Sequence, residues 1–330
     1  MLQPNGIDEN FSADMPQWGH INKGTLQMNP QLAKLSIEDL LARSDLAFKV
    51  GKVQTGYEYL GVHYSSKAYS IIRLDSGKEL GRGASSEYNP MSYLDSLGHI
   101  FGDVKQLGGI PTRVIKFGEG ERAAIQFILP DEYKAGGKEH RLFFNVYGSH
   151  DRSQGNGFNS ADICIVCGNT YAASLASNLL RHFVKHTLNA GSKLAELAQT
   201  VLAVKRAAQA YYTLLDHSAT VKADNATVQA FLAAMIPDTS GGDKRANKAS
   251  DNRREELQAA IRVSQAEREG YIDNSPVTAY DLFSGVTRFT SYKTQKRNDA
   301  EQFEYVTEGP GAKLNDKAYN WLQENVLVYQ

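Results

Sequence analysis

The stretch from Arg141 to Thr187 constrains the fold most, because its hydrophobic pattern changes from that of a strand to that of a helix. It begins with RLFFNVYGS, a run of apolar and aromatic residues typical of a buried strand. A polar loop over residues 149–157 leads to the short apolar run DICIVC, which predicts a second strand. Gly168 and Asn169 end that strand, and apolar residues at helical spacing from Tyr171 onward predict an amphipathic helix. We therefore expect a sheet with a helix packed against it.

A first hairpin is predicted nearer the N-terminus. Residues 57–64 and 68–74 are rich in aromatic and β-branched side chains, as strands are. The polar residues 65–67 are expected to form the turn between them. Asp75-Ser76-Gly77 predicts the turn that ends the second strand.

A second hairpin is predicted over residues 111–129, where PTRVIKF and RAAIQFIL flank the turn Gly118-Glu119-Gly120. Arg113 and Lys116 lie three positions apart on its first strand, so regular strand geometry sends their side chains to opposite faces. Only a bulged or frayed strand would bring both onto one basic surface.

Helices are predicted before, between and after these strands. The segments are one or two short helices from Pro30, a helix opened by Asn89-Pro90, helices at 192–216, 226–236, 279–289 and 313–326, and one beginning at Glu255. The fold class is therefore α+β, with an antiparallel sheet and hairpins packed against long helices, followed by a mainly helical C-terminal region. We divide the chain into a flexible N-terminal arm (1–30), an α+β core domain (31–237), a basic linker (238–255) and a helical C-terminal region (256–330).

The charge balance limits the possible partners. The 36 basic and 37 acidic residues give a net charge of -1, so any site for a polyanion must be a local patch. No apolar run reaches the ~18 residues of a membrane span, and the N-terminal residues lack the pattern of a secretory signal. Two cysteines fit a reducing compartment. We expect a folded protein in the cytoplasm of a bacterial host cell, with no membrane partner.

The two cysteines carry the main enzymatic alternative. Cys164 and Cys167 form C-x-x-C, but i and i+3 on a strand face opposite sides, and no second cysteine pair completes a zinc site. Cys167 alone, at a junction of strand and helix, is the candidate nucleophile of a cysteine-dependent hydrolase. His182 and His186 lie too far along the predicted helix to act as its base, which leaves His150. With no glycine motif for phosphates or dinucleotides either, the sequence predicts no catalytic residue, no metal and no cofactor.

Basic and aromatic residues interleave through the centre of the chain. A single-strand binder needs cations that follow the phosphates and flat rings on which bases stack. An ordinary solvated surface accounts for the same residues, so the pattern leaves both interpretations open. The residues predicted to contact nucleic acid are Arg113, Lys116, Arg122, Arg141, Tyr147, His150, Arg152, Arg181 and Lys185.

Six landmarks along the chain carry a resemblance to a known family. They are Asn89-Pro90 with the helix after it, the hairpin at 113–129, Ser149-His150-Asp151-Arg152, Cys167-Gly168-Asn169-Thr170, the segment 181–187 and the tail from Thr278 to Phe289. In this order they resemble a phage and plasmid-like family known only as a domain of unknown function. The resemblance covers residues 50 to 325 and implies a mobile-element origin without an established activity.

A second resemblance is architectural. A helix, a hairpin, a second helix, further antiparallel strands and a long helix across them resemble the core of single-strand annealing proteins, the group of eukaryotic annealing recombinases and phage Red-beta, RecT and Erf. That group implies oligomeric rings or filaments that hold single-stranded DNA (ssDNA) in a basic groove without a catalytic metal. The leading hypothesis is therefore a non-catalytic ssDNA-binding and annealing protein of a phage or plasmid, acting as a homo-oligomer. A mobile-element protein that binds a host protein is a further alternative.

Overall fold

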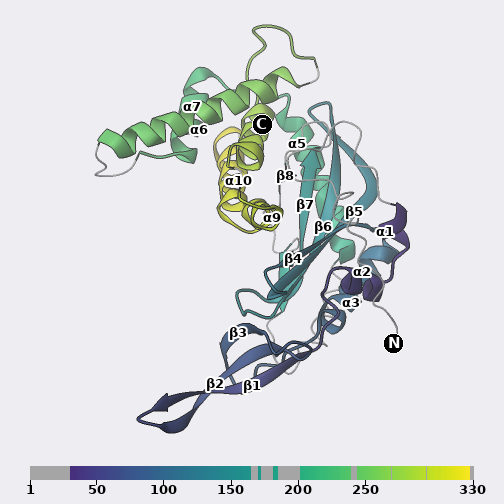
Figure 1. Cartoon of the computed structure of the whole chain (residues 1–330). Coiled ribbons are helices and arrows are strands. Elements are labelled where there is room, and N and C mark those ends of the chain that lie inside the picture. The colour runs from purple at the N-terminus through teal and green to yellow at the C-terminus, as the bar shows by residue number, and fades with distance from the viewer. Residues whose placement is uncertain are drawn as a thin grey trace.

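A computed structural model describes residues 30–164, 170–171, 181–184, 201–238, 244–268, 270–294 and 296–327. Its centre is a six-stranded antiparallel sheet (Figure 1). The strands pair in the order β4-β5-β6-β7-β8, and β9 also pairs with β7. Their bounds are β4 (Ile110–Phe117), β5 (Arg122–Ala135), β6 (Lys138–Ser149), β7 (Asn156–Cys164), β8 (Thr170–Tyr171) and β9 (Arg181–Val184).

The helices are distributed along the described residues, and several match the predicted ones. The segments predicted at 226–236, 279–289 and 313–326 correspond to α6, α8 and α10. Among the described residues, no helix has both the length and the apolar character needed to cross a bilayer. The helical bounds are α1 (Pro30–Lys34), α2 (Ile37–Arg43), α3 (Tyr93–Gln106), α5 (Val201–Ser218), α6 (Asn225–Met235), α7 (Lys244–Ala266), α8 (Ala279–Arg288), α9 (Asp299–Thr307) and α10 (Pro310–Leu322), with π-helical turns η2 (Phe289–Lys293) and η3 (Gln323–Leu327).

The two faces of the central sheet bury different side chains. One face packs against α3 and α5 in the main apolar core, through residues such as Phe127, Phe144 and Val146. The other face packs against α9, whose Phe303 joins a small apolar cluster with Tyr147 and its neighbours. Because both faces are covered, β6 is buried along most of its length. The predicted α+β fold is confirmed.

A three-stranded sheet projects from the body at the end away from α7 (Figure 1). Leu60 and Gly61 both have positive φ and form the two-residue turn of its long hairpin. The turn predicted at residues 65–67 is wrong, because a polar run also fits an exposed strand and these residues lie inside β2. The turn predicted at 75–77 is confirmed. The strands are β1 (Val50–Tyr59), β2 (Val62–Arg73) and β3 (Glu79–Ala84), paired in that order.

The start of α3 is set by a serine cap. Ser92 Oγ accepts a hydrogen bond from the Asp95 backbone N–H at 3.2 Å, so the helix begins at Tyr93 and not at Pro90. The Tyr93 ring then lies over Gly148 of β6, where a Cβ atom would be 2.6 Å from the ring. A glycine at this position therefore lets α3 approach the sheet closely.

Residues 181–184 form a strand and not part of the predicted amphipathic helix. β9 pairs with β7, with Arg181 opposite Asn159, and β8 pairs with β7 as well. Apolar residues at this spacing fit either a helix or a strand. The strand forms because the edge of β7 is free to pair with it. The helix predicted at 192–216 is found as α5 from residue 201 onward. Residues 165–169, 172–180 and 185–200 lie outside the described residues.

The basic segment at 244–254 is helical. Helix α7 runs without a break from Lys244, so the helix predicted to begin at Glu255 starts earlier, because lysine and arginine favour a helix interior. Residues 239–243 of the predicted linker lie outside the described residues. Side chains on both sides of that linker, such as Leu142 and Ile261, belong to one apolar core. The C-terminal helices therefore share their core with the sheet.

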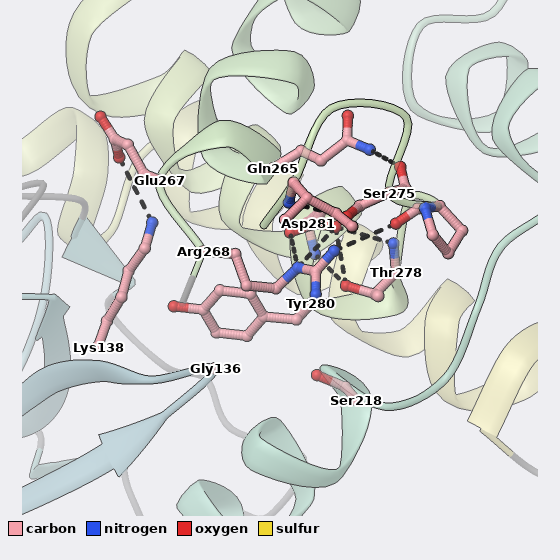
Figure 2. Close-up of polar contacts among 12 residues, drawn as sticks. Gly136, Lys138, Ser218, Gln265, Glu267, Arg268, Ser275, Thr278, Tyr280 and Asp281 are labelled. Carbon is pink, nitrogen blue, oxygen red and sulfur yellow. Dashed lines mark hydrogen bonds and ion pairs between the residues drawn. The ribbon is translucent and has the colours of Figure 1, made fainter. Parts of the chain in front are cut away.

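A buried ion pair fixes the corner between α7 and α8 (Figure 2). Arg268 Nε lies 3.0 Å from a carboxylate oxygen of the fully buried Asp281. Asp281 also accepts from the backbone N–H and the hydroxyl of Thr278, which completes a capping box at the start of α8. Beside this corner, Lys138 of β6 lies 3.4 Å from Glu267. These contacts tie the two helices to the sheet.

A buried arginine holds the projecting sheet to the body. The Arg73 guanidinium, at the end of β2, lies 2.8 Å from both Asp45 and Asp75 and donates to the Glu119 carbonyl at 3.1 Å. It also lies 4.0 Å over the Phe48 ring. Because these partners come from the loop after α2, the β2–β3 turn and the β4–β5 turn, one side chain connects the two sheets. We call this group the Arg73 clamp.

Removing the charge of Asp45 should weaken the Arg73 clamp in a pH-dependent way. Hydrogen bonds from Arg73 and Lys116 hold the pKa of Asp45 well below its ordinary value of about 3.9. The ion pairs therefore stabilise the fold fully at neutral pH, and this contribution is lost as the pH falls through the depressed pKa of the folded state. We expect Asp45→Asn to lower the free energy of unfolding by about 1 kcal/mol near pH 7, and by less below about pH 4.

Urea titrations of both proteins across this pH range measure the difference. Glu87→Gln, in the exposed loop after β3, is the matched control and should leave stability unchanged. If Asp45→Asn lowers the free energy of unfolding by the same amount at neutral and acidic pH, the carboxylate charge is not what stabilises the clamp.

Candidate functional site

Strand pairing brings five of the residues predicted to contact nucleic acid onto one face of the central sheet. Alternate residues of one strand share a face, and so do residues directly opposite one another on paired strands. We call the α9 side of the sheet the polar sheet face. The predicted residues on it are Arg113, Arg122, Arg141, Tyr147 and, by its backbone position, Arg181.

A row of amide side chains crosses the middle of the polar sheet face. Arg113, Gln126, Asn145, Asn159 and Arg181 lie opposite one another on five neighbouring strands. Gln126 Nε2 donates to Asn145 Oδ1 at 2.9 Å, and Asn145 Nδ2 donates to Asn159 Oδ1 at 2.9 Å. We call Gln126, Asn145 and Asn159 the amide ladder. All three are buried, and each carries both a donor and an acceptor, as the edges of nucleobases do.

Helix α9 covers this face. Arg113 is 6% exposed and Tyr147 is 1% exposed. The Thr307 carbonyl of α9 accepts from Asn159 Nδ2 at 3.4 Å, and the ring centroid of Phe303 lies 6.0 Å from that of Tyr147. Tyr147 therefore offers no ring to solvent while α9 is in place.

Carboxylates neutralise the arginines at the rim of the polar sheet face. Arg122 contacts Glu304 of α9 through two parallel hydrogen bonds, at 2.7 and 3.0 Å. Hydrogen bonding to Glu304 raises the pKa of Arg122. At the other end of the face, Arg141 pairs with Glu132 and Glu139. The positive charge of both arginines is thus already matched within the chain.

Two other predicted residues lie on the opposite side of the sheet. Lys116 faces away from Arg113, as their spacing predicts, and pairs with Asp45 at 2.9 Å. His150 is buried on the α3 side, with its ring 4.3 Å from that of Tyr93. Neither residue can join the polar sheet face in this arrangement.

The remaining two predicted residues are Arg152 and Lys185. Arg152, in the loop after β6, donates to the Arg82 carbonyl at 2.8 Å and so ties this loop to β3. Lys185 lies outside the described residues.

The hydrolase alternative centred on Cys167 also falls outside the described residues. The structure does contain an acid–histidine pair that the sequence analysis missed: His140 Nδ1 lies 2.9 Å from Asp162 Oδ2. Asp162 also accepts from the hydroxyls of Tyr211 and Tyr212, at 3.2 and 2.8 Å. All four side chains are buried between the sheet and α5, so they serve to join these elements. No group of side chains suited to holding a metal ion is found in the part of the chain that the structure describes.

The β1–β2 hairpin carries an exposed aromatic face that the sequence analysis also missed. Tyr57 lies opposite Tyr64, and Tyr59 opposite Val62, so these four side chains share a face. Tyr57 and Tyr59 are 61% and 62% exposed, and the Tyr57 and Tyr64 rings stack 5.3 Å apart. We call this the aromatic hairpin face. Its signal in the sequence is the alternation of aromatic residues on both sides of Leu60-Gly61.

The charge of this hairpin indicates the kind of partner that it fits. Residues 53–66 contain one acidic residue and neither lysine nor arginine. An exposed, nearly uncharged aromatic surface is typical of a protein contact, whereas a polyanion requires cations.

Comparison with known proteins connects the polar sheet face with a family. Residues 113–308 match the family model described as Domain of unknown function (DUF932). This range includes the polar sheet face and α9. No curated protein matches the chain, and no solved structure does.

Breaking the amide ladder should destabilise the fold. Asn145→Ala removes the acceptor of Gln126 and a donor to Asn159, and leaves buried polar groups without those partners. We expect a loss of about 2–4 kcal/mol in the free energy of unfolding, measured by urea denaturation. Gln54→Ala removes an exposed amide of β1 and should change the same quantity by less than about 0.5 kcal/mol. Equal losses for both variants would mean that the ladder adds nothing beyond a surface amide.

Proposed function

The chain belongs to the DUF932 family, which is defined without a function, and from the chemistry of its polar sheet face we propose that it binds and anneals ssDNA as a homo-oligomer. The activity is non-catalytic. We place it in the cytoplasm of a bacterial host that carries a phage or plasmid, in keeping with the resemblances of the sequence.

The observation that carries this proposal is the gathering of arginines, amides and a tyrosine on one sheet face. Arg113, Arg122 and Arg141 come from three neighbouring strands, and the backbone position of Arg181 extends the row to β9. Guanidinium groups bind phosphates through two parallel hydrogen bonds. Tyr147 provides a ring for stacking. A row of such groups across a sheet suits a single strand better than a duplex, because single-stranded bases are free to stack.

The aromatic hairpin face supports self-association. Its three tyrosines and Val62, together with Leu60 of the adjoining turn, leave on the order of 500 Å² of apolar surface exposed on each copy. Two copies packed face to face would bury roughly 1,000 Å², the lower limit for a specific interface. The same patch then serves both partners, as two-fold contacts require. We therefore take a second copy of this chain as the occupant of this face, with a host protein as the alternative.

Neutralising an arginine of the polar sheet face should reduce the salt dependence of ssDNA binding. Each single-strand phosphate that the protein no longer neutralises lowers the slope of log affinity against log salt by about 0.7, because fewer counterions are released. We expect this for Arg141→Gln, because phosphate can replace the exposed partners Glu132 and Glu139 of this arginine. We expect it for Arg181→Gln as well, and fluorescence anisotropy of a labelled oligothymidylate over a salt series measures both.

Lys116→Gln is the matched control for this experiment. It removes one positive charge from the opposite face of the same sheet, so the slope should stay at the wild-type value. A lower slope for Lys116→Gln, with unchanged slopes for the two arginine variants, would place the DNA contacts on the other face.

Polar substitutions on the aromatic hairpin face should separate the subunits. In Tyr57→Ser/Tyr59→Ser the apolar contact area falls, so light scattering should show a smaller assembly than the wild type. Apparent ssDNA affinity should fall by about 10²-fold, because linked subunits bind a strand with avidity. Ile272→Ser removes a similarly exposed apolar side chain between α7 and α8, outside the hairpin, and should change neither quantity. A wild-type protein that stays monomeric with and without ssDNA would argue against annealing and would favour the host-protein alternative.

A further inference from the structure

We propose that α9 is an autoinhibitory lid, in which the Glu304 carboxylate takes the place of a nucleic-acid phosphate on Arg122. The inference rests on the proposed function, since it concerns access to the polar sheet face. Its ligand class is single-stranded nucleic acid, and its closed state is the arrangement that the structure describes.

The Arg122–Glu304 contact has the geometry of a phosphate contact. Nη1 lies 2.7 Å from Oε1 and Nη2 lies 3.0 Å from Oε2, which is the two-pronged arrangement that a guanidinium also makes with phosphate. The guanidinium is flanked by Asp151, 3.4 Å from Nε, and by the Phe117 ring at 4.6 Å. A phosphate and the Glu304 carboxylate would therefore compete for one rigid, pre-oriented group.

Helix α9 and the residue after it are acidic. Residues 299–308 carry four acidic side chains and neither lysine nor arginine. Glu301 is turned outward and pairs with Arg297, while Glu304 is turned toward the sheet. Because Glu304 lies on a sheet face that bears arginines, the lid presents to that face the same sign of charge as a DNA backbone.

Besides the Arg122–Glu304 pair, the contacts described between α9 and the polar sheet face include an apolar cluster and a long hydrogen bond. Phe303 of α9 packs into the small apolar cluster with Tyr147, and the Thr307 carbonyl accepts from Asn159 at the long distance of 3.4 Å. The two hydrogen bonds of the Arg122–Glu304 pair, at 2.7 and 3.0 Å, are both shorter than this one. If α9 is displaced, the amide ladder and Tyr147 become available to bases, next to the arginine that would bind phosphate.

The variant Glu304→Gln tests the lid directly. It keeps the shape of the side chain but removes the charge, so a larger fraction of molecules should be open. Apparent affinity for a labelled oligothymidylate should rise by about tenfold, because it scales with the open fraction. Glu301→Gln removes the same charge from the outward side of the same helix and should leave affinity unchanged. Circular dichroism confirms that both variants are folded.

A second measurement needs no variant. Hydrogen exchange of the wild-type amides in residues 299–307 should become faster when oligothymidylate is added, because α9 leaves the sheet. Slower or unchanged exchange on a protein that binds the oligonucleotide would overturn the lid.

The outcomes separate the lid from the proposed function. If the wild type binds ssDNA and Glu304→Gln binds no more tightly than Glu301→Gln, the lid is wrong and the proposed function stands. If neither the wild type nor Glu304→Gln binds ssDNA at low salt, the proposed function is wrong and the lid with it. If Glu304→Gln binds and the wild type does not, both are supported.

Discussion

The pairing of β5 with β6 is the constraint on which the remainder of the structure depends. These are long strands of 14 and 12 residues, and a bulge between Ile128 and Glu132 lets the pairing continue to their far ends. A shift of one residue would exchange the two faces, bringing Asn145 into the apolar core and Phe144 onto the polar sheet face. The amide ladder opposes this shift, because its buried donors and acceptors match only in the observed register.

The same register explains why the two faces of the sheet carry different kinds of side chain. The face toward α3 and α5 is mainly apolar and is covered by helices of the main core. The face toward α9 combines arginines, amides and a small apolar cluster, and a nine-residue helix covers it. The lid and the proposed DNA contacts therefore concern one surface, and a strand bound there would replace protein carboxylates with its own phosphates.

The parts of this arrangement that local sequence determines could be predicted. The hairpin at 111–129 and the opposite orientations of Arg113 and Lys116 follow from alternation and turn residues. The amide ladder could not be found in this way, because its members are aligned only by the register of separate strands. The Arg122–Glu304 contact joins residues 182 positions apart, and no local pattern indicates such a pair. The strand at 181–184 was missed for a related reason, since its partner edge on β7 is a tertiary feature.

The projecting hairpin, fixed at its base by the Arg73 clamp, has a geometric property of its own. The hairpin can become longer or shorter without changing the contacts of the body, because the aromatic hairpin face lies beyond the residues that the clamp holds. Adding one residue to each strand would turn the tyrosines to the other side, whereas adding two would keep their direction and move them outward by about 6.6 Å. If two copies contact each other through these tips, the length of the hairpin sets the distance between their bodies. Natural variation in it would change the spacing between neighbouring subunits in discrete steps, without altering a single residue of the core.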